Sequence, residues 1–263
     1  MVEIAEMLAD LEAESADLDR LVADLPPDGW ERPTPSPGWT IAHQIAHLAW
    51  TDSASLLAVT DADAYGEHLA QAMADPSAFV DRGAREWLAP PEELLARWRD
   101  GRAALAAALA QVPPGARVFW YGNVMTAPSM ATARIMETWA HGLDVADALG
   151  VTREPTARLR HIAYLGYRTV GHSFLAHDRP APTEPIAFVL TAPDGSLWTY
   201  GDPSVDNRVT GPALDLCLLV TQRRHRDDLA LTATGLIADQ WLDVAQAFAG
   251  PPGSGRAPKD GHA

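Results

Sequence analysis

The sequence predicts an α+β protein, with a larger helical unit over residues 1–180 and a smaller α/β unit over 181–250. Apolar residues recur at helical spacing through most of the first unit. The pattern then changes, because the proline-rich stretch PAPTEP is followed by strand-like segments and an Asp-Gly turn. The length of 263 residues also fits one domain of ordinary size and a smaller second one.

The first helices are predicted from apolar spacing and from the residues that stop them. A helix is expected over about residues 2–25, where two prolines end it. Thr40 follows a turn rich in proline and is a plausible N-cap for a helix that continues to about residue 59. Residues 61–89 are mixed, with alanine-rich helical pieces.

Three further segments complete the helical unit. A clear helix is expected over 90–111, because two prolines and two glutamates open it. Residues 117–127 indicate a loop with some extended character. The next helix spans about 128–149 and is terminated by Gly150. A last helix is expected over about 155–177.

The second unit alternates strands and helices. IAFVLTAP and LWTYGD predict two strands joined by an Asp-Gly turn. An extended NRVTG, a helix over 212–222, a short strand in DLALTATG and a helix over 237–248 follow. The tail, residues 251–263, has little apolar surface to bury and is expected to be disordered.

Composition excludes several classes of partner. A formal charge of -15 repels phosphate, so neither nucleic acid nor an anionic membrane surface is an expected partner. The N-terminus is acidic and amphipathic, unlike a signal peptide, and no apolar run is long enough to span a bilayer. The single Cys217 fits a reducing compartment. We expect a cytoplasmic protein, monomeric or homodimeric, that binds small molecules.

Two stretches place metal-ligand side chains on one face of a helix. GWTIAHQIAHL sets His43 and His47 four residues apart, and RIMETWAHGLDV sets Glu137 and His141 four apart. Residues at this spacing share a helix face, and bundle proteins build metal sites from such facing helices. Two histidines and a glutamate form the three-ligand set of a catalytic zinc site, which leaves one coordination position open. Each pair alone is also typical of a cap or a surface contact.

A resemblance to a known family agrees with this pattern. GWTIAHQIAHLAW, followed at long distance by ETWAHGLDVADALG, resembles the metal-binding domain of the DinB/YfiT-like superfamily, specifically the mycothiol-dependent maleylpyruvate isomerase family of actinobacteria. The likeness covers a DinB-like four-helix-bundle domain, and residues 186–249 resemble the small C-terminal domain of those proteins. The C-terminal WLDVAQAFAGPPG is more similar to a poorly characterised metal-binding branch than to the isomerase itself.

The resemblance implies His47, Glu137 and His141 as the metal ligands. Zinc is expected, although this donor set does not separate zinc from nickel or iron. His43 then donates a hydrogen bond to a metal ligand, contacts the substrate or acts as a general base. The alternative is a capping or core histidine. Asp144 is placed to accept the far N–H of a metal-bound imidazole, or is a solvated helix residue.

Other residues are candidates for binding the substrate or the thiol. Arg134 could anchor a carboxylate, or form an ion pair with an acidic neighbour. Trp120 and Tyr121, in the loop before the ligand helix, are expected to line the pocket. Arg223 and Arg224 belong to the basic stretch QRRHR, which either binds a substrate carboxylate or is a solvated helix end.

Several other chemistries lack their sequence patterns. No G-x-S-x-G elbow, G-x-G-x-x-G motif or Walker A sequence is present, which argues against serine hydrolase and nucleotide chemistry. Cys217 lies in the apolar LDLCLLV and is expected to be an inert core thiol.

The resemblance also implies a reaction. In the isomerase, mycothiol adds to a cis double bond, rotation follows, and elimination returns the trans isomer; related members transfer the activated thiol to other electrophiles. We therefore expect a zinc-dependent isomerase or S-transferase that acts on a small, anionic electrophile. The alternatives are a non-catalytic metal-binding or pathway accessory protein and a thiol-free metal-dependent lyase or hydrolase.

Overall fold

The computed structural model describes residues 4–75, 78–121 and 123–259, and the chain divides into two compact units, Met1–Arg153 and Glu154–Ala263. Each unit is described by itself. Within the described ranges, no helix is long and apolar enough to cross a membrane.

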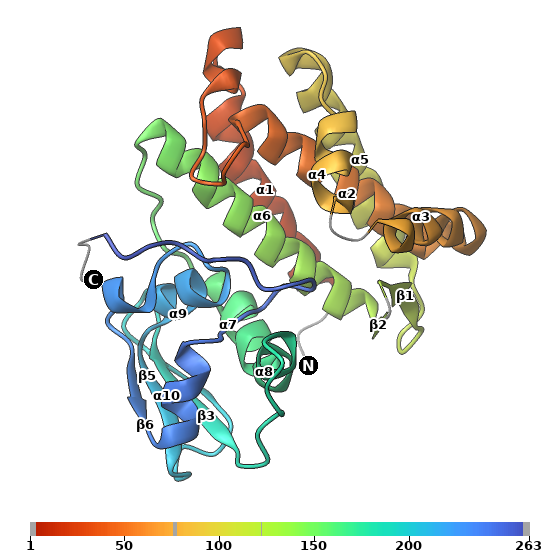
Figure 1. The fold of residues 1–263 in the computed structure, drawn as a ribbon. Helices are drawn as coiled ribbons and strands as arrows, with labels where there is room; N and C mark the ends of the chain where they lie inside the picture. The colour runs from red at the N-terminus through yellow and green to blue at the C-terminus, as the bar shows by residue number, and fades with distance from the viewer. Residues whose placement is uncertain (1–3, 76–77, 122, 260–263) are drawn as a thin grey trace. The chain divides into compact units, whose positions relative to one another are not determined.

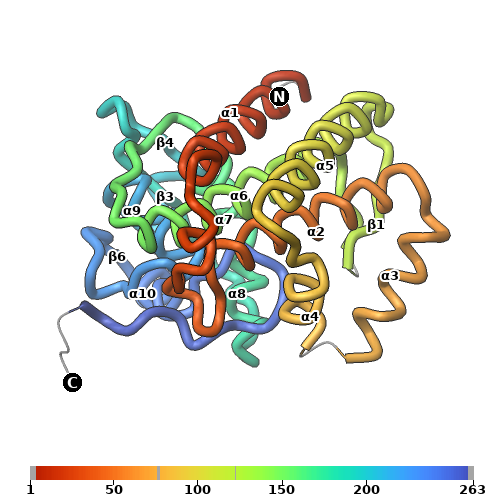
Figure 2. Tube along the Cα trace, turned by 90° about the horizontal axis from the view of Figure 1, so that it is seen from above, coloured from red at the N-terminus to blue at the C-terminus, as the bar shows by residue number. Residues whose placement is uncertain are grey.

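The first unit is a four-helix bundle (Figure 1). Its long helices are α1 (Ile4–Val22), α2 (Ile41–Thr60), α5 (Pro91–Gln111) and α6 (Ala127–Leu149). Helix α2 packs against both α5 and α6, and α1 packs against α6 and α5, which closes the bundle. Figure 2 shows these helices from above. The helices expected over about 2–25, 40–59, 90–111 and 128–149 are present in this order.

Local sequence explains where the two helices nearest the candidate site begin and end. Thr40 precedes α2 in extended backbone, as its predicted role as N-cap requires. Thr126 caps α6 by accepting a hydrogen bond from the Ser129 amide at 3.3 Å. Gly150 ends α6 in the left-handed region, with a φ of 70°, where a side chain would be strained.

Shorter elements cover one side of the bundle. The mixed segment forms α3 (Ala62–Ala74) and α4 (Phe79–Glu86), and a short 3-10 helix spans Pro27–Glu31. The segment predicted as a loop instead forms a small antiparallel hairpin of β1 (Val118–Trp120) and β2 (Asn123–Met125). The sequence indicated only extended character in this segment, and the pairing of the two strands gives it a regular structure.

The second unit contains a mixed four-stranded sheet in the order β4-β3-β5-β6. Strands β3 (Ile186–Thr191) and β4 (Leu197–Tyr200) form the predicted antiparallel hairpin. Strand β5 (Asn207–Pro212) pairs parallel to β3, with Phe188 opposite Val209, and antiparallel to β6 (Thr232–Thr234). Helix α10 (Leu236–Leu242) packs against β5 and β6.

The division between the units lies earlier than the sequence predicts, at residue 153 instead of 180. The helix expected over 155–177 is split into α7 (Leu159–Arg168) and α8 (Val170–Ala176), and both belong to the second unit. Helix α7 packs on α9 (Ala213–Val220). An apolar stripe in a sequence indicates that a helix is buried, but it does not indicate which other element the helix packs against.

Hydrogen bonds to other elements of the second unit determine the backbone path of the segment after α10, residues 243–259. Helix α10 ends earlier than predicted, because the backbone beyond it binds other elements: the Ala247 amide donates to Val220 O at 2.8 Å. Residues 251–259 contain neither helix nor strand, and the Lys259 amide donates to Asp228 at 3.1 Å. The predicted disorder of the tail stays a prediction, and its last four residues lie outside the described ranges.

Candidate metal centre

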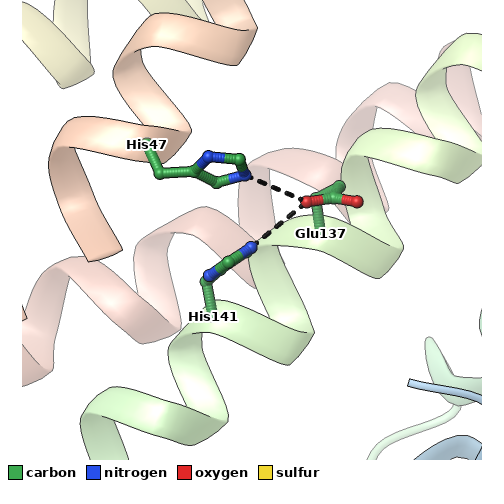
Figure 3. Close-up of side chains that lie close together, drawn as sticks. All are labelled: His47, Glu137 and His141. Atoms are coloured by element: carbon green, nitrogen blue, oxygen red, sulfur yellow. Dashed lines mark hydrogen bonds and ion pairs between the residues drawn. The ribbon is translucent and has the colours of Figure 1, made fainter. Parts of the chain in front are cut away.

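His47 on α2 faces Glu137 and His141 on α6 (Figure 3). One donor atom from each of the three side chains lies within 4.8 Å of the others. Glu137 Oε2 is 3.4 Å from His47 Nε2 and 3.2 Å from His141 Nε2. The structure therefore brings together the three residues that were predicted as ligands.

The distances test whether the three residues fit a metal ion. Bonds of about 2.0–2.1 Å in a tetrahedral zinc site separate neighbouring ligand atoms by about 3.3 Å. The contacts of Glu137 Oε2 with the two imidazoles, 3.4 and 3.2 Å, match that separation. Ordinary charge-assisted hydrogen bonds are shorter, at about 2.7–2.9 Å. The donor set and its spacing fit a divalent metal ion.

Electrostatics hold the cluster in the protonation states that metal binding needs. Burial, together with the neighbouring His141, lowers the pKa of His47 to about 4 against the opposing effect of Glu137. Burial alone would raise the pKa of Glu137, but hydrogen bonds from His141 and His47 outweigh it and hold this pKa well below its usual value. At neutral pH His47 is thus a neutral imidazole and Glu137 a carboxylate, which are the ligand forms.

Gln44 orients His141. Gln44 Oε1 lies 2.5 Å from His141 Nδ1, within hydrogen-bonding distance, and this contact holds the ring with its Nε2 turned toward Glu137. Gln44 Nε2 in turn donates to Thr34 Oγ1 at 2.9 Å, so the amide itself is held. The sequence predicted Asp144 for the position at the far N–H, but the structure places Gln44 there, and Asp144 accepts from Ser36 Oγ at 3.0 Å.

Aromatic rings position His47. Its imidazole lies 5.4 Å from the Trp39 ring and 5.9 Å from the Trp50 ring, measured between centroids. His47 Nδ1 is buried without a hydrogen-bond partner among the described residues. Packing against two indoles, together with the contact of its Nε2 with Glu137, therefore sets the orientation of this imidazole.

His43 takes up the capping position that the sequence left as an alternative. Its Nδ1 lies 2.9 Å from Thr40 Oγ1 and accepts from the Thr40 amide at 3.3 Å. Burial lowers the pKa of His43, the Arg85 guanidinium adds to this, and Asp81 opposes it. His43 is not part of the three-residue cluster. A role for His43 in handling substrate stays a prediction.

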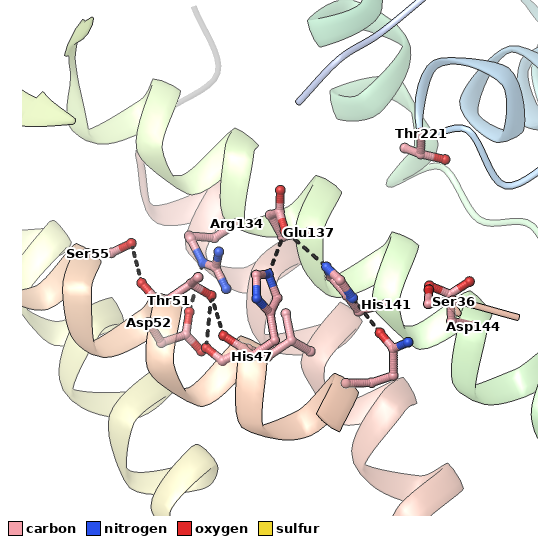
Figure 4. A network of polar contacts seen from close by, with 12 residues as sticks. Ser36, His47, Thr51, Asp52, Ser55, Arg134, Glu137, His141, Asp144 and Thr221 are labelled. Carbon is pink, nitrogen blue, oxygen red and sulfur yellow. Dashed lines mark hydrogen bonds and ion pairs between the residues drawn. The ribbon is translucent and has the colours of Figure 1, made fainter. Parts of the chain in front are cut away.

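Arg134 forms a buried ion pair one helical turn from Glu137. Its Nε donates to Asp52 Oδ1 on α2 at 2.8 Å, and the two side chains are 2% and 6% exposed (Figure 4). Of the two readings of Arg134, the ion pair is therefore present, and carboxylate binding stays a prediction.

Trp120 and Tyr121 belong to a cluster of aromatic side chains beside Trp50. The Trp120 ring stacks on Tyr65 at 6.0 Å, and the Tyr121 hydroxyl lies 2.5 Å from His68 Nε2. Tyr121 has a positive φ of 41°, and its amide donates to the Tyr65 hydroxyl at 2.9 Å. Trp50 connects this cluster to the metal centre, because its ring lies 5.8 Å from His68 and also contacts His47.

The remaining candidates lie in the second unit. Arg223 donates to Thr221 O at 2.6 Å and Arg224 donates to Arg223 O at 2.7 Å, just beyond the end of α9. Substrate binding by these two arginines stays a prediction. Cys217 is fully buried, and burial raises the pKa of its thiol, as expected for an inert core residue.

Three polar residues near the centre were missed at the sequence level: Gln44, Asp52 and His68. Asp52 had a recognisable signal, because it is the only acidic residue in α2. Gln44 lies three residues before His47 and so shares its helix face. His68 lies in a segment without any motif.

A four-helix bundle that gathers two histidines and a glutamate from facing helices has the arrangement from which bundle proteins build metal sites. Residues 11–146 match the family model of the mycothiol maleylpyruvate isomerase N-terminal domain. The chain belongs to this family, which confirms the resemblance seen in the motifs.

Similar proteins and structures agree with this assignment. Uncharacterized proteins from two strains of Mycobacterium tuberculosis are each 53% identical over 97% of this chain and 100% of their own length. Crystal structures of the mycothiol-dependent maleylpyruvate isomerase and of a histidine-to-alanine mutant share the fold, with a TM-score of 0.59. Each is 17% identical over 88% of this chain and 93% of the solved chain. They confirm the α+β fold class.

Proposed function

We propose that this protein is a metal-dependent enzyme that uses a low-molecular-weight thiol, such as mycothiol, on a small electrophilic substrate. The observation that carries the proposal is the cluster of His47, Glu137 and His141, in which Glu137 Oε2 lies 3.4 and 3.2 Å from the two imidazole nitrogens, the separation of neighbouring ligands in a tetrahedral site. Membership of the mycothiol maleylpyruvate isomerase family supports the thiol and the isomerase chemistry. The buried, single Cys217 fits a reducing, cytoplasmic location.

A divalent ion, zinc foremost, supplies Lewis acidity when bound, and lowers the pKa of a thiol at the open coordination position. The protein's own residues orient the ligands and keep them in the required protonation states. Gln44 holds His141 with its Nε2 toward the centre, and Glu137 stays ionised at neutral pH. Trp39 and Trp50 cover His47 and limit the access of water.

The reaction proposed first is cis–trans isomerisation. Sulfur forms a bond to one carbon of a cis double bond that is conjugated to a carbonyl, whose oxygen takes the displaced electron pair. Rotation about the new single bond and loss of the same sulfur return the trans alkene and the unchanged thiol. Transfer of the thiol to another electrophile needs the same activated sulfur and is the related possibility.

The test is a spectroscopic titration of the full chain loaded with cobalt. We expect stoichiometric cobalt, and a sulfur-to-cobalt charge-transfer band that grows as mycothiol is added. Turnover is then measured with maleylpyruvate and mycothiol. Cobalt without any response to thiol would contradict the proposal and favour a thiol-free lyase or hydrolase or a non-catalytic metal-binding protein.

His43→Ala separates capping from substrate handling. We expect the variant to retain full metal, because His43 lies outside the ligand cluster, and to lose about 0.5–2 kcal/mol of stability with the cap. Thr40→Ala is the matched control, since it removes the same cap. A turnover loss much larger in His43→Ala than in Thr40→Ala supports substrate handling by the imidazole, and equal losses assign it to the cap.

A further inference from the structure

Arg134 is a buried cation whose hydrogen-bonding capacity is only partly used. Its Nε is bound to Asp52, but its Nη2 is buried and has no hydrogen-bond partner in the described part of the chain. A buried donor without an acceptor is costly, so native proteins hold few of them. An acceptor that comes from outside the chain would remove this cost.

The position of Arg134 indicates where such an acceptor lies. Arg134 comes one helical turn before Glu137 on α6, and Figure 4 shows the end of its guanidinium beside His47. Its positive charge contributes to the low pKa of His47 and opposes the rise that burial causes in the pKa of Tyr121. The guanidinium therefore acts on both the metal cluster and the aromatic cluster around Trp50.

Stability does not explain the Arg134–Asp52 pair. Replacing a buried ion pair with apolar residues of similar volume is often neutral or stabilising. Charge balance offers a better reason. With a divalent ion in place, Glu137, Asp52 and Arg134 leave an excess of one positive charge in a buried region. One further anion neutralises that excess.

We propose that Arg134 is the anion-binding residue of the metal centre, with its Nη2 donating a hydrogen bond to an anionic sulfur or carboxylate oxygen of the bound thiol or substrate. This deepens the proposed function and rests on it, because the anion is placed beside the metal. Asp52 is a positioning residue, since it holds the guanidinium through Nε and leaves Nη2 for the ligand. The contact is a single hydrogen bond, unlike a two-point clasp of a carboxylate.

The test variant keeps the net charge and leaves no buried charge unpaired, and circular dichroism checks the fold of every variant. Arg134→Met alone leaves Asp52 buried and unpaired, which lowers the stability of the fold. The double variant Arg134→Met/Asp52→Asn removes both charges, keeps the net charge and removes Nη2. Asp52→Asn is the control, because it retains Arg134 and an oxygen that can accept from Nε.

The measurement is the affinity of two small probes for the cobalt-loaded full chain, read from the cobalt spectrum. The probes are 2-mercaptoethanol and acetate, and the cobalt content of each sample is determined in parallel. We expect the double variant to keep stoichiometric cobalt and to bind at least one probe about tenfold or more weakly, the range for a hydrogen bond to a charged group. Asp52→Asn is expected to bind both probes at least as tightly as the unmodified chain, since its Nη2 is intact and one negative charge fewer offsets the metal ion and Arg134.

The outcomes separate this proposal from the one on which it rests. Weaker binding of acetate alone assigns Nη2 to a carboxylate, weaker binding of the thiol alone assigns it to sulfur, and both results support the proposal. Unchanged affinity for both probes in a cobalt-loaded double variant overturns the role of Arg134 and leaves the metal centre standing. An unmodified chain that takes up no cobalt overturns the metal centre itself.

Discussion

At the residue scale, the candidate centre is a small set of ligands held by neighbours that the motif does not contain. The i,i+4 spacing predicted that His43 and His47 share one helix face and Glu137 and His141 another, because helical periodicity is a local property; the family resemblance then selected His47, Glu137 and His141 as the ligands. It could not predict that Gln44 would bind the far nitrogen of His141, because Gln44 and His141 lie on different helices. Asp144 had suitable spacing, but Ser36 from another segment binds it.

The role of Gln44 is tested by Gln44→Ala. The change removes the acceptor at His141 Nδ1, so the imidazole loses its fixed tautomer and orientation. We expect metal affinity to fall about 10- to 100-fold, as for other partners of metal-binding histidines. Competition with a chelator of known affinity measures this change.

Ser36→Ala is the matched control for Gln44→Ala. It removes a hydrogen bond in the same region, to Asp144, but leaves His141 Nδ1 bound. Its metal affinity should stay near that of the unmodified chain. Equal losses in the two variants would contradict a specific role for Gln44.

At the element scale, helices with strong local signals were predicted well, and elements fixed by distant contacts were not. Thr40 and Gly150 mark α2 and α6 by cap geometry that a sequence displays. The break between α7 and α8 at Thr169 carries no proline or glycine, and the Thr169 hydroxyl donates to Gln246 O at 2.8 Å. Such a contact is visible only in the folded unit.

Gly83 sets the approach of α4 to α2 beside the metal centre. A Cβ at Gly83 would lie 2.5 Å from the Trp50 ring, the indole that packs on His47. We expect Gly83→Ala to displace Trp50, to cost about 1–3 kcal/mol of stability by overpacking, and to shift the tryptophan fluorescence. Metal affinity should fall as well.

Gly66→Ala on α3 is the control for Gly83→Ala. Nothing lies within 4 Å of a Cβ at Gly66, so the change should be neutral or stabilising, by up to about 1 kcal/mol through helix propensity. Urea unfolding measures both variants. A Gly83→Ala protein as stable as Gly66→Ala, with unchanged fluorescence, would show that the approach of α4 is not as described.

The contact between α1 and α5 has a defined pH dependence. Arg99 and Arg102 both donate to the carboxylate of Asp19, at 2.6 to 2.8 Å. The Arg99 hydrogen bond holds the pKa of Asp19 below its usual value, against the effect of burial. The ion pairs therefore stabilise the fold above the ordinary aspartate pKa, and this contribution is lost as the pH falls through the lowered pKa.

Asp19→Asn tests this dependence. We expect the variant to be less stable at about pH 7, by about 1 kcal/mol or less for each exposed pair, and the difference to shrink toward zero near about pH 2. Urea unfolding at several pH values measures it. A difference that stays constant with pH would assign the effect to packing instead of charge.

At the scale of the whole molecule, the fold class and the family followed from the sequence, but the division of the chain did not. The residues of the candidate centre all lie in the unit Met1–Arg153. Helix α7 belongs to the second unit, where the Tyr200 hydroxyl donates to Arg160 O at 3.1 Å. Sequence periodicity could not assign α7, because either unit could have buried its apolar face.

A fragment of residues 1–153 should fold and bind one metal ion. All four bundle helices and all three donor residues are contained in it. Circular dichroism and elemental analysis measure helicity and metal content. A fragment that is unfolded would contradict the independence of the first unit, whereas fragment 1–180 should gain no additional metal.

The central claim is that His47, Glu137 and His141 hold a metal ion, and the metal content of the purified full chain tests it most directly. Elemental analysis is made on the unmodified chain and on His47→Ala, Glu137→Ala and His141→Ala, with His43→Ala as the control. We expect one equivalent of metal in the unmodified and His43→Ala proteins and a loss of stoichiometric metal in the other three. Full metal in any of those three would remove that residue from the ligand set, and no metal in the unmodified chain would contradict the account.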